Sequence, residues 1–392
     1  MEKDNSCSSN GSLVSETSGK VITCKAAVAW GTKKPLVIEE VQVDPPKAME
    51  VRIKITHTSL CNTDVMYWAT ENEMLKAFPR ILGHEAAGIV ESVGEGVSDL
   101  KGGDHVITLF TGECGDCIYC KSPKTNLCGK FRIDPTRSVM VSDKKTRFSI
   151  AGKPVYHCMG TSTFSEYTVL DSANVVKINP DAPLNKVCLL GCGLATGFGA
   201  AWNTANVQAG SSVAIFGLGT VGLAVAEGVR VRGASKIIGV DTNPDKFSLA
   251  KNFGVTDFIN PKDQERATHE RIREITEGGV DFSFECIGNA NIMYEAFLSA
   301  HDGWGLAIIV GVDQSGRRLS FFPPELLDGR RIDGTVFGGF KGKSQLPGLV
   351  EMYMNKEVKV DEFITHELPF SRINEAFDLS LEGKSLRCVL HL

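Results

Sequence analysis

Residues 212–241 read SVAIFGLGTVGLAVAEGVRVRGASKIIGVD, and this stretch decides the fold. A buried strand, SVAIF, leads into the turn Gly217-Leu218-Gly219-Thr220-Val221-Gly222, which opens a helix; a second buried strand, KIIGV, ends at Asp241. In such a turn Gly217 permits the tight bend, Gly219 lets the backbone approach a pyrophosphate, and Gly222 lets the helix pack closely on the strand. This context favours a dinucleotide-binding unit over an ordinary glycine-rich turn.

Residues after the turn indicate which dinucleotide binds. A carboxylate about 20 residues beyond the glycines, as at Asp241, accepts hydrogen bonds from ribose hydroxyls and repels a 2′-phosphate. Thr242 and Asn243 follow it in place of an arginine, so NAD is favoured over NADP. Lys246 can reach the same ribose, although a solvated surface lysine would look identical. The start of the helix supplies free N–H groups and a positive dipole end for the phosphates.

The flanking sequence has a different rhythm. Strands alternate with helices over residues 194–336, which is typical of a parallel, doubly wound α/β sheet. Residues 21–60 and 80–110 instead alternate apolar and polar positions in short runs between Pro and Gly turns, which predicts antiparallel β-structure. We therefore predict a Rossmann domain at 194–336 inserted between two parts, 21–193 and 337–392, of a β-rich domain. The segment 1–20 is rich in Ser, Asn and Gly, and predicts a disordered tail.

Composition narrows the functional classes. The 392 residues have a net charge of −5, so no basic excess exists to neutralise nucleic acid or an anionic membrane surface. No apolar run is long enough to span a membrane, and the N-terminus lacks the layout of a secretory signal. We expect a cytoplasmic protein without nucleic-acid or membrane partners. Its twelve cysteines then favour metal binding or chemistry over disulfides.

Four cysteines form the most specific spacing in the chain. They lie in the loop GECGDCIYCKSPKTNLCG, at Cys114, Cys117, Cys120 and Cys128. Four thiolates on one short loop can close a tetrahedron around Zn²⁺ and leave no position for a substrate, so this zinc would be structural. Disulfides are the alternative, and adjacent CxxC pairs in a reducing compartment make them much less favoured.

A second possible zinc site is dispersed along the chain. Cys61, His84 and Cys192 would give two thiolates and an imidazole, which leave the fourth position of a catalytic zinc open for alcohol or water. Singly, each residue could be an ordinary core residue. Asp64, just after Cys61, could orient His84 through its second ring nitrogen. Cys192 precedes the Rossmann domain, which would place it at the interdomain cleft.

Several motifs together resemble the zinc-dependent medium-chain alcohol dehydrogenases, and among them the plant branch. They are LCNTDV, FPRILGHEAAGIVESVGEGV, the four-cysteine loop, GTSTFSEYTV, FGLGTVGLA and SLRCVLHL. The resemblance runs from about residue 21 to the C-terminus. It implies a GroES-like catalytic domain, a Rossmann domain through which such enzymes usually form homodimers, two zinc ions per subunit, NAD, and a small alcohol or carbonyl substrate.

The resemblance also implies roles for single residues. Cys61, His84 and Cys192 match the catalytic zinc ligands, with Glu85 behind the metal, and the four loop cysteines match the structural ligands. Thr63 matches the hydroxyl that takes the substrate proton. The remaining matches are Thr196 and Val310 beside the nicotinamide, Arg387 on the cofactor pyrophosphate, and Phe110 in the substrate pocket.

Three departures from the family pattern concern catalysis. Met66 stands where a histidine or tyrosine often ends the proton relay, and a thioether cannot donate a proton. Asn62 replaces a cation near the pyrophosphate, which would weaken cofactor binding or speed its release. Cys158 and Met159 replace an aromatic or large aliphatic pair, so we predict a wider pocket and a preference for substrates bulkier than ethanol.

Two alternative activities remain open on the same scaffold. A cyanohydrin lyase would expel cyanide without turning over NAD, and the altered relay and pocket raise its chance. A glutathione-dependent formaldehyde dehydrogenase is compatible with Arg132, which does not decide the question because ordinary plant-type enzymes have it too. A non-catalytic NAD sensor is disfavoured by the intact zinc ligands and Thr63.

Overall fold

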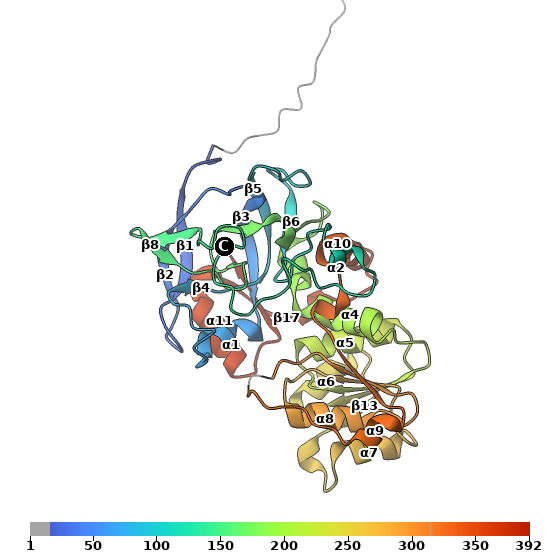
Figure 1. The fold of residues 1–392 in the computed structure, drawn as a ribbon. Coiled ribbons are helices and arrows are strands. Elements are labelled where there is room, and N and C mark those ends of the chain that lie inside the picture. The colour runs from blue at the N-terminus through green and yellow to red at the C-terminus, as the bar shows by residue number, and fades with distance from the viewer. Residues whose placement is uncertain (1–15, 314) are drawn as a thin grey trace, which may run out of the picture.

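The computed structural model describes residues 16–313 and 315–392, and two lobes divide them (Figure 1). The upper lobe of Figure 1 is built from both ends of the chain, in blue to green and in red, and the lower lobe from the yellow and orange middle. The strands of the lower lobe form one sheet, and those of the upper lobe form two.

The lower lobe is a parallel six-stranded sheet. In spatial order its strands are β13 (Asp257–Ile259), β12 (Lys236–Val240), β11 (Ser212–Phe216), β14 (Phe282–Glu285), β15 (Leu306–Ile309) and β16 (Arg331–Gly334). Counted along the chain this order is 3-2-1-4-5-6, that of a dinucleotide-binding Rossmann sheet. The predicted doubly wound fold is confirmed.

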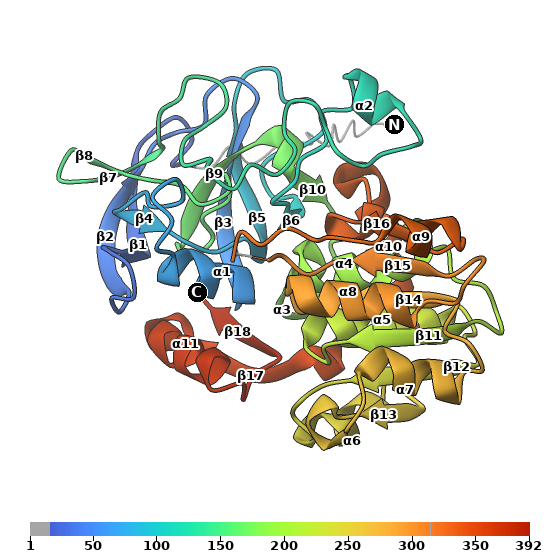
Figure 2. The same cartoon turned by 60° about the horizontal axis from the view of Figure 1, so that its bottom comes forward.

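Helices cover the parallel sheet (Figure 2). They are α5 (Thr220–Val231), α6 (Asp245–Lys251), α7 (Thr268–Ile275), α8 (Ala290–Ser299) and α9 (Pro323–Leu327). Strand order reverses between β11 and β14, and β11 runs straight into the glycine turn before α5. In open α/β sheets a ligand binds at this reversal, outside the carboxyl ends of the strands.

Two sheets build the upper lobe. One has the order β4 (Arg80–Ile81), β1 (Ile22–Ala29), β2 (Val37–Val43), β7 (Phe148–Ile150) and β8 (Lys153–Val155). The other has the order β10 (Val175–Lys177), β6 (His105–Thr108), β5 (Glu85–Val93), β3 (Glu50–Leu60), β18 (Arg387–His391) and β17 (Ile364–Pro369), with β9 (Tyr167–Asp171) also paired to β3. The C-terminal β18 thus pairs antiparallel with the N-terminal β3, which joins the two parts of the β-rich domain.

The other helices connect these layers. They are α1 (Asn62–Ala69), α2 (Ile118–Lys121), α3 (Leu184–Val187), α4 (Gly193–Gly199), α10 (Gly342–Met354) and α11 (Ile373–Leu381). Short η turns, of which η3 is a π-helix, lie at η1 (Ser172–Asn174), η2 (Cys188–Gly191), η3 (Ala200–Thr204), η4 (Pro261–Asp263), η5 (Phe337–Gly339), η6 (Asp361–Phe363) and η7 (Phe370–Arg372). In the described ranges no single helix is long and apolar enough to cross a membrane; only the bent pair Leu184–Gly191 and Gly193–Thr204 meets that test, by length and composition.

The last residues of the predicted tail are ordered. Residues 16–20 form turns against β3, where the buried Arg52 donates to the backbone oxygens of Thr17 (2.8 Å) and Lys20 (2.6 Å). The prediction of disorder is therefore wrong for this part, because a buried guanidinium needs acceptors and the tail supplies them. Residues 1–15 of the predicted tail lie outside the described residues.

Candidate active site and metal centres

A cavity of about 1200 Å³ lies between the two domains. The β-rich domain lines it with the start of α1, Phe110 and Met159, and the Rossmann domain with residues after β11, β14 and β15. These are the carboxyl ends of the parallel strands. The cavity therefore occupies the place where the topology of the sheet predicts a ligand.

Four buried ligand residues converge on one side of this cavity. Cys61 precedes α1, His84 precedes β5, Glu85 begins β5, and Cys192 precedes α4. One ligand atom from each residue lies within 4.8 Å of all the others, and Nε2 of His84 is 3.3 Å from Sγ of Cys192. Segments more than a hundred residues apart thus meet in a cluster of the Cys₂His type with a carboxylate behind it.

The Asp64 carboxylate holds the cluster in place. Its Oδ1 accepts hydrogen bonds from Nδ1 of His84 and the Gly83 amide, both at 3.0 Å, and its Oδ2 accepts one from the Cys61 amide at 3.1 Å. With Nδ1 of His84 bonded to the fully buried Asp64, Nε2 is the ring nitrogen that faces the Cys192 sulfur. A histidine that binds zinc needs this orientation, so the residues fit the metal.

Charges around Cys61 favour its thiolate. The pKa of Cys61 lies well below its usual value, because its sulfur accepts a hydrogen bond from Cys192 and faces the cations of Arg387 and His84, which together outweigh burial. Burial also opposes the charge on His84, but Asp64 and the Cys61 sulfur raise its pKa above the usual value. Zinc binds cysteine as the thiolate, so Cys61 is prepared for the metal. The pKa of Cys192, in contrast, is raised well above its usual value by its hydrogen bond to Cys61 and by burial.

Arg387 links this cluster to the glycine turn. Its Nε lies 3.0 and 3.2 Å from the two carboxylate oxygens of Glu85, its Nη1 donates to Oγ1 of Thr220 at 2.8 Å, and its Nη2 lies 3.5 Å from Sγ of Cys61. Burial raises the pKa of Glu85 to about 8 although Arg387 opposes the shift. Thr220 is the first residue of α5, so the guanidinium lies beside the helix start expected to bind the cofactor phosphates.

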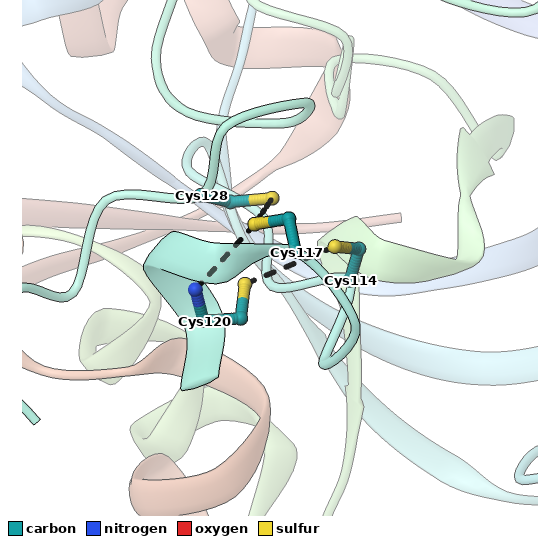
Figure 3. A group of neighbouring side chains, drawn as sticks. All are labelled: Cys114, Cys117, Cys120 and Cys128. Atoms are coloured by element: carbon teal, nitrogen blue, oxygen red, sulfur yellow. Dashed lines mark hydrogen bonds between the residues drawn. The ribbon is translucent and has the colours of Figure 1, made fainter. Parts of the chain in front are cut away.

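The four-cysteine loop has the geometry of a zinc site (Figure 3). The Sγ atoms of Cys114 and Cys120 lie 3.9 Å apart, as do those of Cys117 and Cys128, and none of the four cysteines forms a disulfide. Four sulfurs at about 2.3 Å from a tetrahedral zinc are separated by about 3.8 Å. Amides of Cys120 and Gly129 donate to the Cys117 sulfur, and chiefly these bonds lower its pKa to about 6.

The glycine turn leaves room for a pyrophosphate. Gly217 has a φ of +93°, which favours glycine, and a Cβ on Gly222 would lie 1.8 Å from the Gly217 carbonyl oxygen. A Cβ on Gly219, in contrast, would meet nothing within 4 Å and would occupy the open cradle at the start of α5. The turn therefore needs Gly217 and Gly222 for its own shape, while the bare backbone at Gly219 fits a ligand.

Asp241 directs its carboxylate into the same turn. It accepts hydrogen bonds from the amides of Leu218 (2.8 Å) and Asn243 (2.9 Å), and pairs with Nζ of Lys246 at 2.9 Å. Two carboxylate oxygens offer about four acceptor sites, so capacity remains for a ribose hydroxyl. Lys246 and Asn243 line the cavity.

The structure places most of the other predicted residues on the cavity wall. These are Thr63, Met66, Phe110, Met159, Thr196 and Val310. The prediction that Cys158 lines the substrate pocket is wrong. Its side chain is 0% exposed and faces the core, and it is not among the described residues that line the cavity, whereas its neighbour Met159 is. Val336 and Phe337 also line the cavity, and no motif in the sequence singled them out.

Arg132, considered for a glutathione site, is occupied locally. Its Nε donates to the Cys128 carbonyl oxygen at 2.9 Å and its guanidinium lies 4.6 Å from the centre of the Tyr119 ring. Arg132 is not among the described residues that line the cavity. Its position therefore gives no support to a glutathione-binding role.

Family models match both domains. The alcohol dehydrogenase GroES-like domain matches residues 47–180, and the zinc-binding dehydrogenase domain matches residues 220–355. The chain is 59% identical to alcohol dehydrogenase-like 3 of Arabidopsis thaliana over 97% of this chain and 98% of that protein. It is 61% identical to alcohol dehydrogenase class-3 of Pisum sativum over 95% and 99%.

Solved structures agree with the sequence relatives. An alcohol dehydrogenase zinc-binding domain protein from Burkholderia ambifaria superimposes with a TM-score of 0.87 at 33% identity, covering 95% of this chain and 100% of that one. Benzyl alcohol dehydrogenase from Acinetobacter calcoaceticus gives 0.86 at 30%, covering 95% and 99%. These likenesses support alcohol oxidation and reduction and give no support to the lyase. The chain belongs to the zinc-dependent medium-chain alcohol dehydrogenases and is an oxidoreductase that uses zinc and NAD.

Proposed function

We propose that this dehydrogenase acts on alcohols and carbonyl compounds bulkier than ethanol, and that Cys61, His84 and Cys192 hold its catalytic zinc. One observation above all supports this: the buried Cys₂His cluster borders a cavity of about 1200 Å³ that the glycine turn and Val310 also line. Zinc and substrate would meet on one side of this space and the cofactor on the other.

The residues of the chain divide the work of the reaction. When bound, zinc supplies Lewis-acid polarisation and NAD supplies the oxidant. Thr63 follows the ligand Cys61 and lines the cavity, so its hydroxyl can accept the proton that the alcohol releases. Met66, one helical turn later, cannot pass that proton on, and water must take it to solvent. Asp64 fixes His84, and the start of α5 at Gly219 holds the cofactor phosphates.

Side chains on the substrate side of the cavity support the size preference. Met66, Met159 and Ile133 line it together with Phe110, whose ring is perpendicular to that of Phe337 at 5.5 Å between centroids. Unbranched thioethers adapt to irregular apolar ligands, and the aromatic pair gives a rigid wall. We expect kcat/KM to be highest for an aromatic or longer-chain alcohol.

Steady-state kinetics test the size preference. Initial rates of NADH formation would be measured with ethanol, 1-hexanol and cinnamyl alcohol at saturating NAD. If ethanol has the highest kcat/KM of the three, the proposed preference is wrong.

The assembly and the compartment are also proposals. We infer that the chain forms a homodimer through its Rossmann domain, since β16 ends the parallel sheet with exposed residues and the adjacent Phe322 and Leu327 are 71% and 83% exposed. Analytical ultracentrifugation of wild type and of Leu327→Glu tests this, and a monomeric wild type would contradict it. We place the enzyme in the cytoplasm because its thiolate clusters need a reducing compartment; microscopy of a C-terminal fluorescent fusion tests this.

A further inference from the structure

We propose that Asn126 and Lys341 are positioning residues through which the four-cysteine loop sets the cavity wall at Thr335–Phe337. The loop lies outside the cavity-lining part of the described chain, but two of its contacts extend to the backbone that shapes the cavity. The structural zinc site then serves substrate recognition as well as stability.

Asn126 makes the first connection. It lies between the ligands Cys120 and Cys128, and its amide nitrogen donates to the carbonyl oxygens of Val336 at 2.8 Å and Phe340 at 3.1 Å. These two carbonyls flank η5. A single side-chain amide therefore holds both ends of this short turn against the metal loop.

Lys341 makes the second connection from the opposite direction. It precedes α10, and its Nζ donates to the carbonyl oxygens of Cys120 and Ser122, the second at 2.8 Å. Figure 1 shows α2 of the loop beside α10. Both hydroxyl and amide of Ser344, in the first turn of α10, also bond to the carboxylate of Glu113 at 2.9–3.1 Å. The start of α10 is thus bonded to the loop at two points, just before Cys114 and at Cys120–Ser122.

The segment held in this way is part of the cavity. Thr335, Val336 and Phe337 all line it, and the Phe337 ring packs on Phe110, which in turn lies 5.9 Å from the His84 ring. Phe337 has a φ of +55°, a conformation that bulky residues rarely adopt and that persists only where surrounding contacts impose it. The bonds from Asn126 and Lys341 are contacts of this kind.

Loss of these bonds should change how alcohol binds before it changes folding. Asn126→Asp keeps the shape of the side chain but replaces two N–H donors by a carboxylate oxygen facing two carbonyl oxygens, so repulsion replaces attraction. The turn would relax away from the loop, and Phe337 would move with it. A displacement of about 1 Å in a positioning element can cost up to about a hundredfold in rate.

The experiment compares wild type, Asn126→Asp and Lys341→Met, with Thr125→Ala as the matched control. Thr125 is in the same loop, and among the described residues its hydroxyl bonds locally, to the Leu127 amide. For each protein we would measure zinc per subunit, Tm, and kcat and KM for ethanol and cinnamyl alcohol. The proposal for Asn126 and Lys341 depends on the proposed substrate preference only in the choice of cinnamyl alcohol. The kinetics of the wild type show separately whether that preference exists.

The expected result is a fall of about tenfold in kcat/KM for the larger alcohol, mainly through KM, with a smaller fall for ethanol and two zinc ions retained. Thr125→Ala should stay within about twofold of wild type. If Asn126→Asp and Lys341→Met lower Tm but leave both KM values unchanged, the role is purely structural and the proposal is overturned. If Asn126→Asp loses zinc, the decision rests on Lys341→Met, because Lys341 bonds to carbonyl oxygens and not to the cysteine sulfurs. Unchanged KM values in Lys341→Met would then overturn the proposal.

Discussion

Replacing Asp64 by asparagine should weaken one zinc site and leave the other intact. Asp64 accepts three N–H bonds, two on Oδ1 and one on Oδ2. Asparagine has the same shape but only one acceptor oxygen. If that oxygen stays with His84 and Gly83, the new NH₂ group faces the Cys61 amide, so two donors oppose each other in a fully buried place.

The magnitude follows from the bonds that are lost. At least one charge-assisted hydrogen bond disappears, at about 1.5–3 kcal/mol, and the remaining bonds to His84 and Gly83 become neutral and weaker. Since 1.4 kcal/mol is about a factor of ten in a binding constant, zinc affinity at the Cys₂His site should fall about 10- to 100-fold. Among the described residues no hydrogen bond joins Asp64 to the four-cysteine site, which therefore serves as the internal control.

The assay is competition for zinc with a colorimetric chelator. Wild type should release its two ions at different chelator concentrations, and Asp64→Asn should shift only one of the two steps. Alanine at Thr125 is a suitable control for the loop. Unchanged release of both ions, or a shift in both steps, would refute the reasoning that Asp64 acts through His84 and Cys61.

Four further predictions follow, three from the site and one from the ion pair of Glu91 with Arg52. Gly219→Ala should keep the Tm of wild type, since its Cβ meets no atom within 4 Å, yet lose NAD binding in a fluorescence titration because the added methyl would fill the space proposed for the pyrophosphate. Met66→His should raise kcat for alcohol oxidation near pH 7 by about tenfold by adding a proton acceptor; an unchanged pH–rate profile would argue that water already suffices. Asn62→Arg should tighten NAD binding in a titration, because it restores a cation near the phosphates; equal affinity would contradict this. The pKa of Glu91 is lowered to about 2, because hydrogen bonds from Arg52 and two hydroxyls outweigh burial. The ionised carboxylate therefore stabilises the fold above pH 4.5, and this contribution is lost as the pH falls toward 2. Glu91→Gln should lower Tm at pH 7, and the difference in Tm from wild type should shrink between pH 4.5 and pH 2.

Features that are local in the sequence could be predicted. The glycine turn, Asp241 and the four cysteines are each confined to one short stretch, and the parallel sheet follows from the alternation around them. Cys61, His84 and Cys192 could be suggested as a dispersed zinc site, but only the family resemblance gave them roles, because Cys192 lies more than a hundred residues from the other two and no local spacing links them.

What could not be predicted depends on tertiary contacts. Cys158 is fully buried while its neighbour Met159, with a φ of +51°, lines the cavity, and no local sequence pattern indicates this difference. The bonds between Asn126 and Val336 join residues 210 positions apart, and nothing in either stretch indicates the other. The composition of residues 16–20 indicates only that they have little apolar surface to bury. It does not indicate that the buried Arg52 bonds to the backbone oxygens of this segment.

That arginine sets a limit on how short the enzyme can be made. A version that begins after residue 20 would remove two of the acceptors of Arg52 and leave a positive charge enclosed by protein, beside Glu91 alone and one long contact to Val43. Purification tags are therefore better added ahead of Glu16 than in place of residues 16–20.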